Sequence, residues 1–200
     1  MSNLDRDYEL EFLVDGNLEA YKNLEKTHNG KVEYANGTIL LSSNTSINHN
    51  LIIKRLLIET DRYFRKIPCE TFSEAIEIIM DKSNRKYNFK PDVFVMCKEE
   101  GKDDFNRKGQ SLIGIPSLVF EVVSQGNANH DTLYKRKAYA ECGVKEYCLV
   151  YQDGKIEQLE LKSNEYYEIN AIYNIKDTYK SLVYEGLEFN LEDIFYDLKY

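Results

Sequence analysis

The sequence lacks the features of several specialised classes of protein. It contains no run of about 18 apolar residues, and residues 1–10 are acidic instead of basic and then apolar. These absences argue against a membrane span and a secretory signal, and we therefore expect a cytoplasmic protein with no membrane contact. Only 3 of the 200 residues are Pro and 10 are Gly, while 42% are hydrophobic and 30% charged. This composition argues against large-scale disorder and predicts one globular domain over residues 1–200.

Cysteine is also scarce and shows no paired spacing. The four cysteines, Cys69, Cys97, Cys142 and Cys148, form no C-x-x-C motif, so a zinc site is not predicted. Four cysteines in 200 residues are also too few for a disulfide scaffold. Cys97, Cys142 and Cys148 lie on or beside apolar segments, and for these three we predict small buried thiols.

The net charge of −8 would by itself argue against a nucleic-acid partner, but the charge is unevenly distributed. Residues 1–40 carry four basic and eight acidic groups, and residues 151–200 carry five and eleven. The middle of the chain, residues 41–150, has 17 basic and 15 acidic groups and is therefore weakly positive. This distribution permits a nucleic-acid substrate without requiring one.

Alternation and turn signals predict a mixed α/β (α+β) domain around a sheet. Residues 31–43 form two short alternating runs around Asn36-Gly37, the strongest local signal for a hairpin. Residues 46–64 carry apolar side chains at helical spacing, with Ser46 as the N-cap. For residues 8–14 a short strand and the start of a helix both remain open.

The other elements are predicted from the same patterns, as a core over about residues 31–150 and a C-terminal part over 151–200. Strands are expected as two short pieces within 68–80 and at 91–96, 117–123, 145–150, 155–161, 166–172 and 180–184. Helices are expected at about 131–142 and 191–198. Residues 81–90 are expected to form a polar connection, and 98–114 a loop.

Two carboxylates interrupt the apolar strands at the centre of this pattern. Glu121 lies inside the run Ser-Leu-Val-Phe-Glu-Val-Val, and Asp92 lies at the start of Asp-Val-Phe-Val-Met. Burying an unpaired charge is strongly unfavourable, so each of them needs a cation. A Lys-rich helix follows Glu121, and Lys135 on it is the candidate partner. Two carboxylates and a lysine suit a divalent-metal site for phosphodiester hydrolysis.

Simpler explanations exist for each residue taken alone. A Pro-Asp pair such as Pro91-Asp92 commonly starts a strand or turn, and Glu121 could form a buried Glu–Lys pair. Lys135 follows Asp131 by four residues, the spacing of an exposed helical pair worth about 0.2–0.5 kcal/mol. Only the joint occurrence of these residues favours a metal site.

The same residues carry a resemblance to a known family. The chain resembles the bacterial restriction endonuclease family called the Uma group, within the PD-(D/E)xK nuclease superfamily. The matching motifs occur in the family's order: Pro91-Asp92, Glu121 to Ser124, Asp131 with Lys135 and Tyr139, then Gly143, Val144, Glu146 and Tyr147. Glu33 and His49 upstream, and the segment Gly-Leu-Glu-Phe-Asn-Leu-Glu-Asp-Ile-Phe near the end, match the family as well. Tyr139 and Tyr147 are expected to be packing residues.

The resemblance implies a restriction-endonuclease-like fold, a mixed sheet flanked by helices, and an Mg²⁺- or Mn²⁺-dependent endonuclease acting on DNA. Asp92, Glu121 and the backbone carbonyl of Val122 would bind the metal, and Lys135 would stabilise the reacting phosphate. Glu33 and His49 would be accessory residues. A homodimer is expected, because cleavage of both strands of a duplex generally needs two sites.

One departure from the superfamily pattern leaves other functions open. The (D/E)xK lysine would stand two residues after Glu121, where this chain has Val123, and the helical Lys135 would replace it. A catalytically inactive nuclease-fold module that binds DNA or protein without turnover is the main alternative. A metal-dependent enzyme acting on RNA or a small phosphate is a third.

Overall fold

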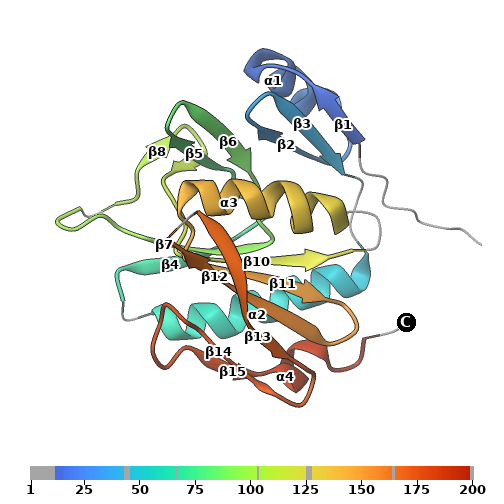
Figure 1. The fold of residues 1–200 in the computed structure, drawn as a ribbon, viewed down its shortest axis with the longest axis vertical. Helices are drawn as coiled ribbons and strands as arrows, with labels where there is room; N and C mark the ends of the chain where they lie inside the picture. Colours follow the sequence, from blue (N-terminus) through green and yellow to red (C-terminus); the bar gives the residue numbers. More distant parts are fainter. Residues whose placement is uncertain are drawn as a thin grey trace, which may run out of the picture.

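The protein is built around two β-sheets with helices packed on both faces of the central one (Figure 1). The computed structural model describes residues 12–42, 46–65, 67–102, 104–124, 128–163 and 165–198. The predicted mixed α+β architecture, a sheet flanked by helices, is confirmed. No helix in these described residues is long and apolar enough to cross a membrane.

The central sheet has six strands, and its middle strand, β10 (Leu118–Val123), is buried along its whole length. In the described part of this sheet, β10 and β11 (Glu146–Tyr151) form the one parallel pair, and the other pairs are antiparallel. The order across the sheet is β13 (Tyr166–Tyr173), β12 (Lys155–Lys162), β11, β10, β7 (Val93–Cys97) and β4 (Cys69–Ser73). A strand buried on both faces matches the nearly continuous apolar run of the sequence.

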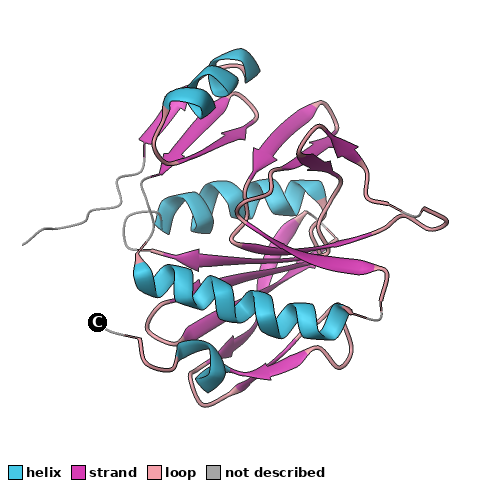
Figure 2. Ribbon diagram, turned by 180° about the vertical axis from the view of Figure 1, so that it is seen from behind, coloured by secondary structure: helices cyan, strands magenta, loops and turns pink. Residues whose placement is uncertain are grey.

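Successive side chains of β10 point to opposite faces of the sheet. Leu118, Phe120 and Val122 pack with α2 (Ile47–Phe64) and α4 (Leu191–Phe195) in one core cluster. Val119 and Val123 pack with α3 (Arg136–Cys142) in the other. Figure 2 shows α2 and α4 in front of the sheet, with α3 on its far side. The alternation therefore directs Glu121 toward the α3 face.

The second sheet, which contains the N-terminal strands, lies on the α3 side of the molecule (Figure 1). It comprises β1 (Phe12–Asp15), β3 (Thr38–Ser42), β2 (Lys31–Ala35), β6 (Arg85–Phe89), β5 (Ile78–Lys82), β9 (Ser111–Ile113) and β8 (Arg107–Lys108) in that order. Helix α1 (Leu18–Thr27) covers its first strands. The predicted β2–β3 hairpin is confirmed, and Asn36 and Gly37 both have positive φ (44° and 104°), as its tight turn requires.

Several sequence predictions were wrong in the regions with weak turn signals. Residues 85–89 form strand β6 and not a connection, because Ser83 and Asn84 adopt positive φ and close a second hairpin. The loop at 98–114 contains β8 and β9. No strand spans 180–184; a two-stranded sheet of β14 (Thr178–Lys180) and β15 (Glu188–Asn190) flanks that turn, and α4 ends at Phe195. Of residues 8–14, the described part belongs to β1.

The cysteine prediction is confirmed for two residues and wrong for one. Cys142 and Cys148 are buried free thiols. Cys97 is exposed and joined by a disulfide to Cys69, which lies opposite it on the neighbouring strand β4. The antiparallel register of β4 and β7 brings the two side chains together. The two cysteines are 28 residues apart in the sequence, and local sequence patterns do not predict the pairing of strands at that separation.

Glu146, at the start of β11, is a completely buried carboxylate that organises the C-terminal segment. It accepts hydrogen bonds from the Tyr179 hydroxyl (2.6 Å), the Ser181 hydroxyl (2.6 Å) and the Gln158 amide (2.5 Å). The backbone N–H groups of Leu182 and Val183 donate to it as well. A buried carboxylate with this many donors is stabilising only while all of them are paired.

Replacing Glu146 by Ala should therefore destabilise the fold strongly. The change leaves buried hydroxyl, amide and N–H donors unsatisfied, and we expect a loss of at least about 3 kcal/mol in the free energy of unfolding. Urea unfolding would measure it. Glu160→Ala, at the partly exposed position opposite Glu146 on β12, is the matched control and should change stability by less than about 1 kcal/mol. Equal losses in both variants would contradict this role of Glu146.

Candidate active site

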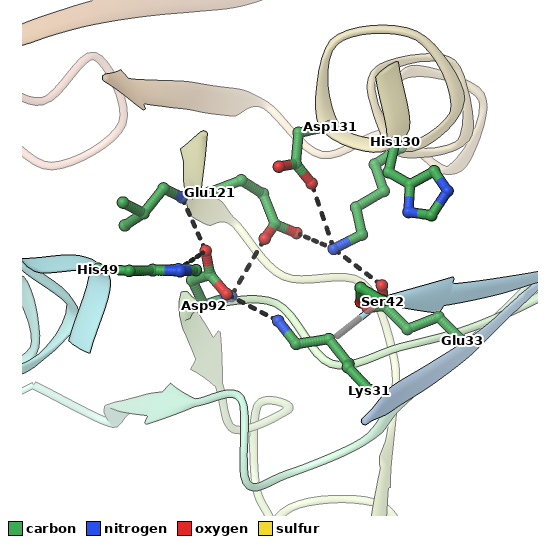
Figure 3. A pocket seen from close by; sticks show the side chains of 10 residues that line it. Lys31, Glu33, Ser42, His49, Asp92, Glu121, His130 and Asp131 are labelled. Atoms are coloured by element: carbon green, nitrogen blue, oxygen red, sulfur yellow. Dashed lines mark hydrogen bonds and ion pairs between the residues drawn. The ribbon is translucent and has the colours of Figure 1, made fainter. Parts of the chain in front are cut away.

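Side chains from both sheets and two helices converge on one small cavity beside the end of β10 (Figure 3). Its volume of about 20 Å³ is enough for a single water-sized species. The lining consists almost entirely of charged and polar residues: Lys31, Glu33, Ser42, His49, Asp92, Glu121, Val122, His130, Asp131 and Lys135. All five residues predicted as catalytic or accessory, Asp92, Glu121, Lys135, Glu33 and His49, lie in this lining.

The strand register places the two predicted metal ligands next to each other. The antiparallel pairing of β7 and β10 ends at Val93 and Phe120. Asp92 and Glu121 are the next residues along these two segments and therefore lie beside each other. The N–H of Asp92 donates to Glu121 Oε2 at 3.3 Å. Both side chains are almost fully buried. The apolar strands therefore fix the direction and spacing of the two carboxylates.

Both oxygens of Asp92 have partners. Oδ2 accepts the Val122 N–H at 2.7 Å and lies 2.9 Å from His49 Nε2, and Oδ1 lies 2.8 Å from Lys31 Nζ. Burial alone would raise the pKa of Asp92, but Lys31 and His49 outweigh it and hold the pKa below its ordinary value. Val122 thus contacts Asp92 through its N–H, and the metal-binding role of its carbonyl stays a prediction.

His49 reaches Asp92 from the first turn of α2. The Ser46 hydroxyl oxygen accepts the His49 N–H, so the predicted N-cap is confirmed and it fixes the start of the helix. His49 is buried, and its Nδ1 has no hydrogen-bond partner among the described residues. His49 therefore contacts one of the two predicted metal ligands directly.

Glu121 Oε1 accepts two hydrogen bonds from the helix that follows it. Lys135 Nζ lies at 3.0 Å and the Tyr139 hydroxyl at 2.8 Å. Burial raises the pKa of Glu121 to about 7, and the neighbouring Asp92 and Glu33 add to the rise against the opposing effect of Lys135. Tyr139 is thus more than the packing residue predicted from sequence. Tyr147, also predicted to pack, donates its hydroxyl to the backbone carbonyl of Asp131.

Lys135 is buried at the centre of the site, so the surface-pair interpretation of this residue was wrong. Its ammonium lies 3.0 Å from Glu33 Oε2, 3.0 Å from Glu121 Oε1 and 3.5 Å from Asp131 Oδ1. Burial opposes its charge, but Glu121 and Glu33 outweigh burial and raise the pKa of Lys135 well above its ordinary value. Lys135 ends a π-helical turn, η1 (His130–Lys135), which continues directly into α3. π-Helical turns are rare in proteins, but those that occur often lie at functional sites.

The sequence prediction missed Lys31, on β2. Lys31 and Glu33 are two residues apart on a strand and therefore share a face, while Val32 between them packs into the core beside α1. Lys31 Nζ bridges Asp92 Oδ1 and Glu74 Oε2, the latter at 3.1 Å. The alternation of Lys31 and Glu33 along the predicted strand was the sequence feature from which Lys31 could have been identified as a site residue.

The site holds more carboxylates than cations. Among the described residues, the cavity lining brings Glu33, Asp92, Glu121 and Asp131 together with the two ammonium groups of Lys31 and Lys135 and the imidazoles of His49 and His130. Burial raises the pKa of Asp131 well above its ordinary value, and the nearby Glu121 and Asp92 add to the rise. Clustered carboxyl oxygens of this kind match the ligand chemistry of Mg²⁺ and Mn²⁺.

A divalent cation nevertheless requires some rearrangement. Among the described residues, no three His, Cys, Asp or Glu side chains are already arranged around a common metal position. The oxygens of Asp92 and Glu121 point at ammonium and N–H groups instead. The donor set fits a hard cation, and at least one lysine must then give up its carboxylate.

Comparison with known proteins identifies the family of this chain and agrees with its fold. The model of the Uma2 family, described as “Putative restriction endonuclease”, matches residues 18–192. The chain belongs to this family. The solved structure of “a putative nuclease” from Anabaena variabilis has a TM-score of 0.63 and 13% sequence identity, covering 82% of this chain and 89% of that chain. At this identity the likeness shows the fold alone. No curated protein matches the chain.

In this Uma2 protein an apolar side chain occupies the position two residues after Glu121. Val123 lies on the same face of β10 as Glu121 and packs into the core beneath α3. The amine that contacts Glu121 comes from Lys135, one helix further along the chain. The ammonium beside Glu121 is therefore that of Lys135, and not that of a lysine two residues after Glu121.

Replacing Glu121 by Gln should change how stability depends on pH in metal-free protein. Folding raises the pKa of Glu121 from 4.5 to about 7, so between these values the folded state binds more protons than the unfolded state. The contribution of Glu121 to the free energy of unfolding therefore falls as the pH rises through this window. Relative to wild type, Glu121→Gln should gain on the order of 3 kcal/mol between about pH 5 and about pH 8.

Urea unfolding in EDTA would measure this difference at each pH. His130 contributes in the opposite direction, because burial and Lys135 lower its pKa to about 4 and stability then rises with pH. Both proteins share this contribution, whereas the raised pKa of Asp131 depends partly on Glu121, so the difference between their curves reports Glu121 together with its effect on Asp131. A difference that stays constant over the whole range would contradict the raised pKa.

Proposed function

We propose that this Uma2 protein is an Mg²⁺- or Mn²⁺-dependent endonuclease that hydrolyses DNA phosphodiester bonds. The observation that carries the proposal is the buried triad of Asp92, Glu121 and Lys135 at the adjoining ends of two strands. Buried charges that serve stability alone are commonly balanced, whereas this cavity has surplus carboxylate. A surplus of this kind supports a bound cation.

Each side chain has a distinct task in this proposal. Asp92 and Glu121 hold the cation, with the carbonyl of Val122 as a third ligand. The bound Mg²⁺ or Mn²⁺ supplies a Lewis acid and an activated water. Lys135 keeps a positive charge at the position where the phosphate gains negative charge.

The surrounding residues hold these groups in place. His49 and the N–H of Val122 orient Asp92 through its Oδ2. The Tyr139 hydroxyl orients Glu121, and Glu33 keeps Lys135 charged by pairing with it. Residues that position first ligands in this way usually matter nearly as much as the ligands.

DNA is the proposed substrate because the middle of the chain, which carries most of the site, is weakly positive between two acidic flanks. A homodimer is part of the proposal, since cleavage of both strands of a duplex needs two sites. The family's description as a restriction endonuclease supports the same substrate.

The alternative function is a nuclease-fold module that binds DNA without cleaving it. Val123 in place of the superfamily lysine, and the net charge of −8, favour this alternative. Such a module would retain DNA in gel-shift assays in EDTA, with an affinity that falls steeply with salt in proportion to the phosphates contacted. The proposed enzyme would differ in showing turnover with metal.

Nicking of a supercoiled plasmid with Mn²⁺, Mg²⁺ or EDTA tests the enzyme directly. Wild type should cleave with either metal and not in EDTA. Asp92→Asn and Glu121→Gln should each lower the cleavage rate by at least about 100-fold, because each removes a charged ligand. Both proteins should still give the wild-type circular dichroism spectrum.

Asp61→Asn, on the exposed face of α2, is the control and should cleave like wild type. Metal-dependent cleavage that persists in both site variants would exclude this site as the active site. Absence of cleavage by folded wild type with either metal would favour the binding module.

A further inference from the structure

The two lysines of the site contact different carboxylates. Lys135, the proposed catalytic ammonium, contacts Glu121, whereas Lys31 contacts Asp92. We propose that Lys31 occupies the metal position on Asp92 in the metal-free protein and transfers to Glu74 when a divalent cation binds. The proposal rests on the metal-dependent function proposed above. It assigns to Lys31 the role of an internal competitor that sets the metal affinity of the site.

The contacts of Asp92 identify the oxygen that a metal would take. Oδ2 is held by the Val122 N–H and by His49, both of which belong to rigid elements. Oδ1 is held only by Lys31 Nζ among the described residues. A lysine side chain has four flexible carbons, so this is the partner that can leave without moving the backbone.

Lys31 also has a second anchor on the outer side of the cavity. Its ammonium lies between Asp92, whose side chain is 3% exposed, and Glu74, whose side chain is 28% exposed. Lys135, in contrast, is held by three buried carboxylates and has no outer partner among the described residues. The outward path from Asp92 to Glu74 is therefore open to Lys31 alone of the two lysines.

The size of the cavity supports the same conclusion. At about 20 Å³ it has space for one water-sized species. Mg²⁺ keeps several of its waters when it binds to one or two carboxylates. The withdrawal of Lys31 would free both Asp92 Oδ1 and additional space for a cation that keeps some of its waters.

This arrangement predicts opposite effects for two substitutions. Lys31→Met keeps most of the side-chain volume and removes the competing charge, so Mn²⁺ affinity should rise by about tenfold or more. Glu74→Gln removes the outer anchor, so Lys31 stays on Asp92 and Mn²⁺ affinity should fall. Because Glu74 also carries charge of its own, the two substitutions are combined as a double-mutant cycle.

Calorimetric titration of the full chain with Mn²⁺ alone measures these affinities after EDTA has been removed. Glu74→Gln should weaken binding in the wild-type background and have a much smaller effect in the Lys31→Met background. Asp92→Asn introduced into Lys31→Met should abolish the tighter binding, which locates the metal at this site. Lys82→Met, which removes an exposed lysine paired with Glu165, is the control and should bind Mn²⁺ like wild type.

The outcomes separate this inference from the proposed function. If wild type binds Mn²⁺ and folded Lys31→Met binds it no more tightly, the competitor role is overturned while the metal site stands. If neither protein binds Mn²⁺, both proposals fail. Should Lys31→Met not fold, Glu74→Gln decides alone: unchanged or tighter binding in that variant overturns the role of Lys31.

Discussion

The buried ammonium of Lys135 is the interaction on which the arrangement of the site depends. It joins Glu33 of β2, Glu121 of β10 and Asp131 of its own helix, and so connects both sheets to the π-helical turn. A lysine at this depth keeps its charge only while the carboxylates surround it, and they are tolerated there only because of the lysine. The elements that carry these residues are consequently fixed relative to one another by electrostatics as well as by packing.

The second constraint is the register of the central sheet. Because β7 and β10 stop pairing at Val93 and Phe120, the next residues along the two strands are the carboxylates Asp92 and Glu121, of which Glu121 still pairs with Leu149 of β11. Side-chain donors from α2, β2 and η1 then contact the two carboxylates at this position. The apolar core therefore determines where the acidic groups lie, and the charged groups from the surrounding elements adapt to that position.

Local patterns predicted the parts of this molecule that short stretches of chain determine. The Asn36-Gly37 turn, the Ser46 cap and the buried run of β10 all depend on neighbouring residues, and each was identified from the sequence. Lys31 was missed because its partner Asp92 is 61 residues away, and Cys97 was misjudged because its partner lies on another strand. The strand at 85–89 was missed because Ser83-Asn84 is a weak turn signal, even though both residues adopt positive φ.

Burial alone does not distinguish a structural carboxylate from one suited to chemistry, as Glu146 and Glu121 demonstrate on adjacent strands. Glu146 begins an apolar strand, Glu121 interrupts one, and both are almost completely buried. Glu146 lies beside the start of β10 and is satisfied by neutral hydroxyl, amide and backbone donors. Glu121 lies toward the end of β10 and depends on a shared ammonium, with further carboxylates beside it. A carboxylate that shares an ammonium with other carboxylates can exchange this partner for a metal cation. A carboxylate enclosed by neutral donors would have to leave several buried donors unpaired to bind one.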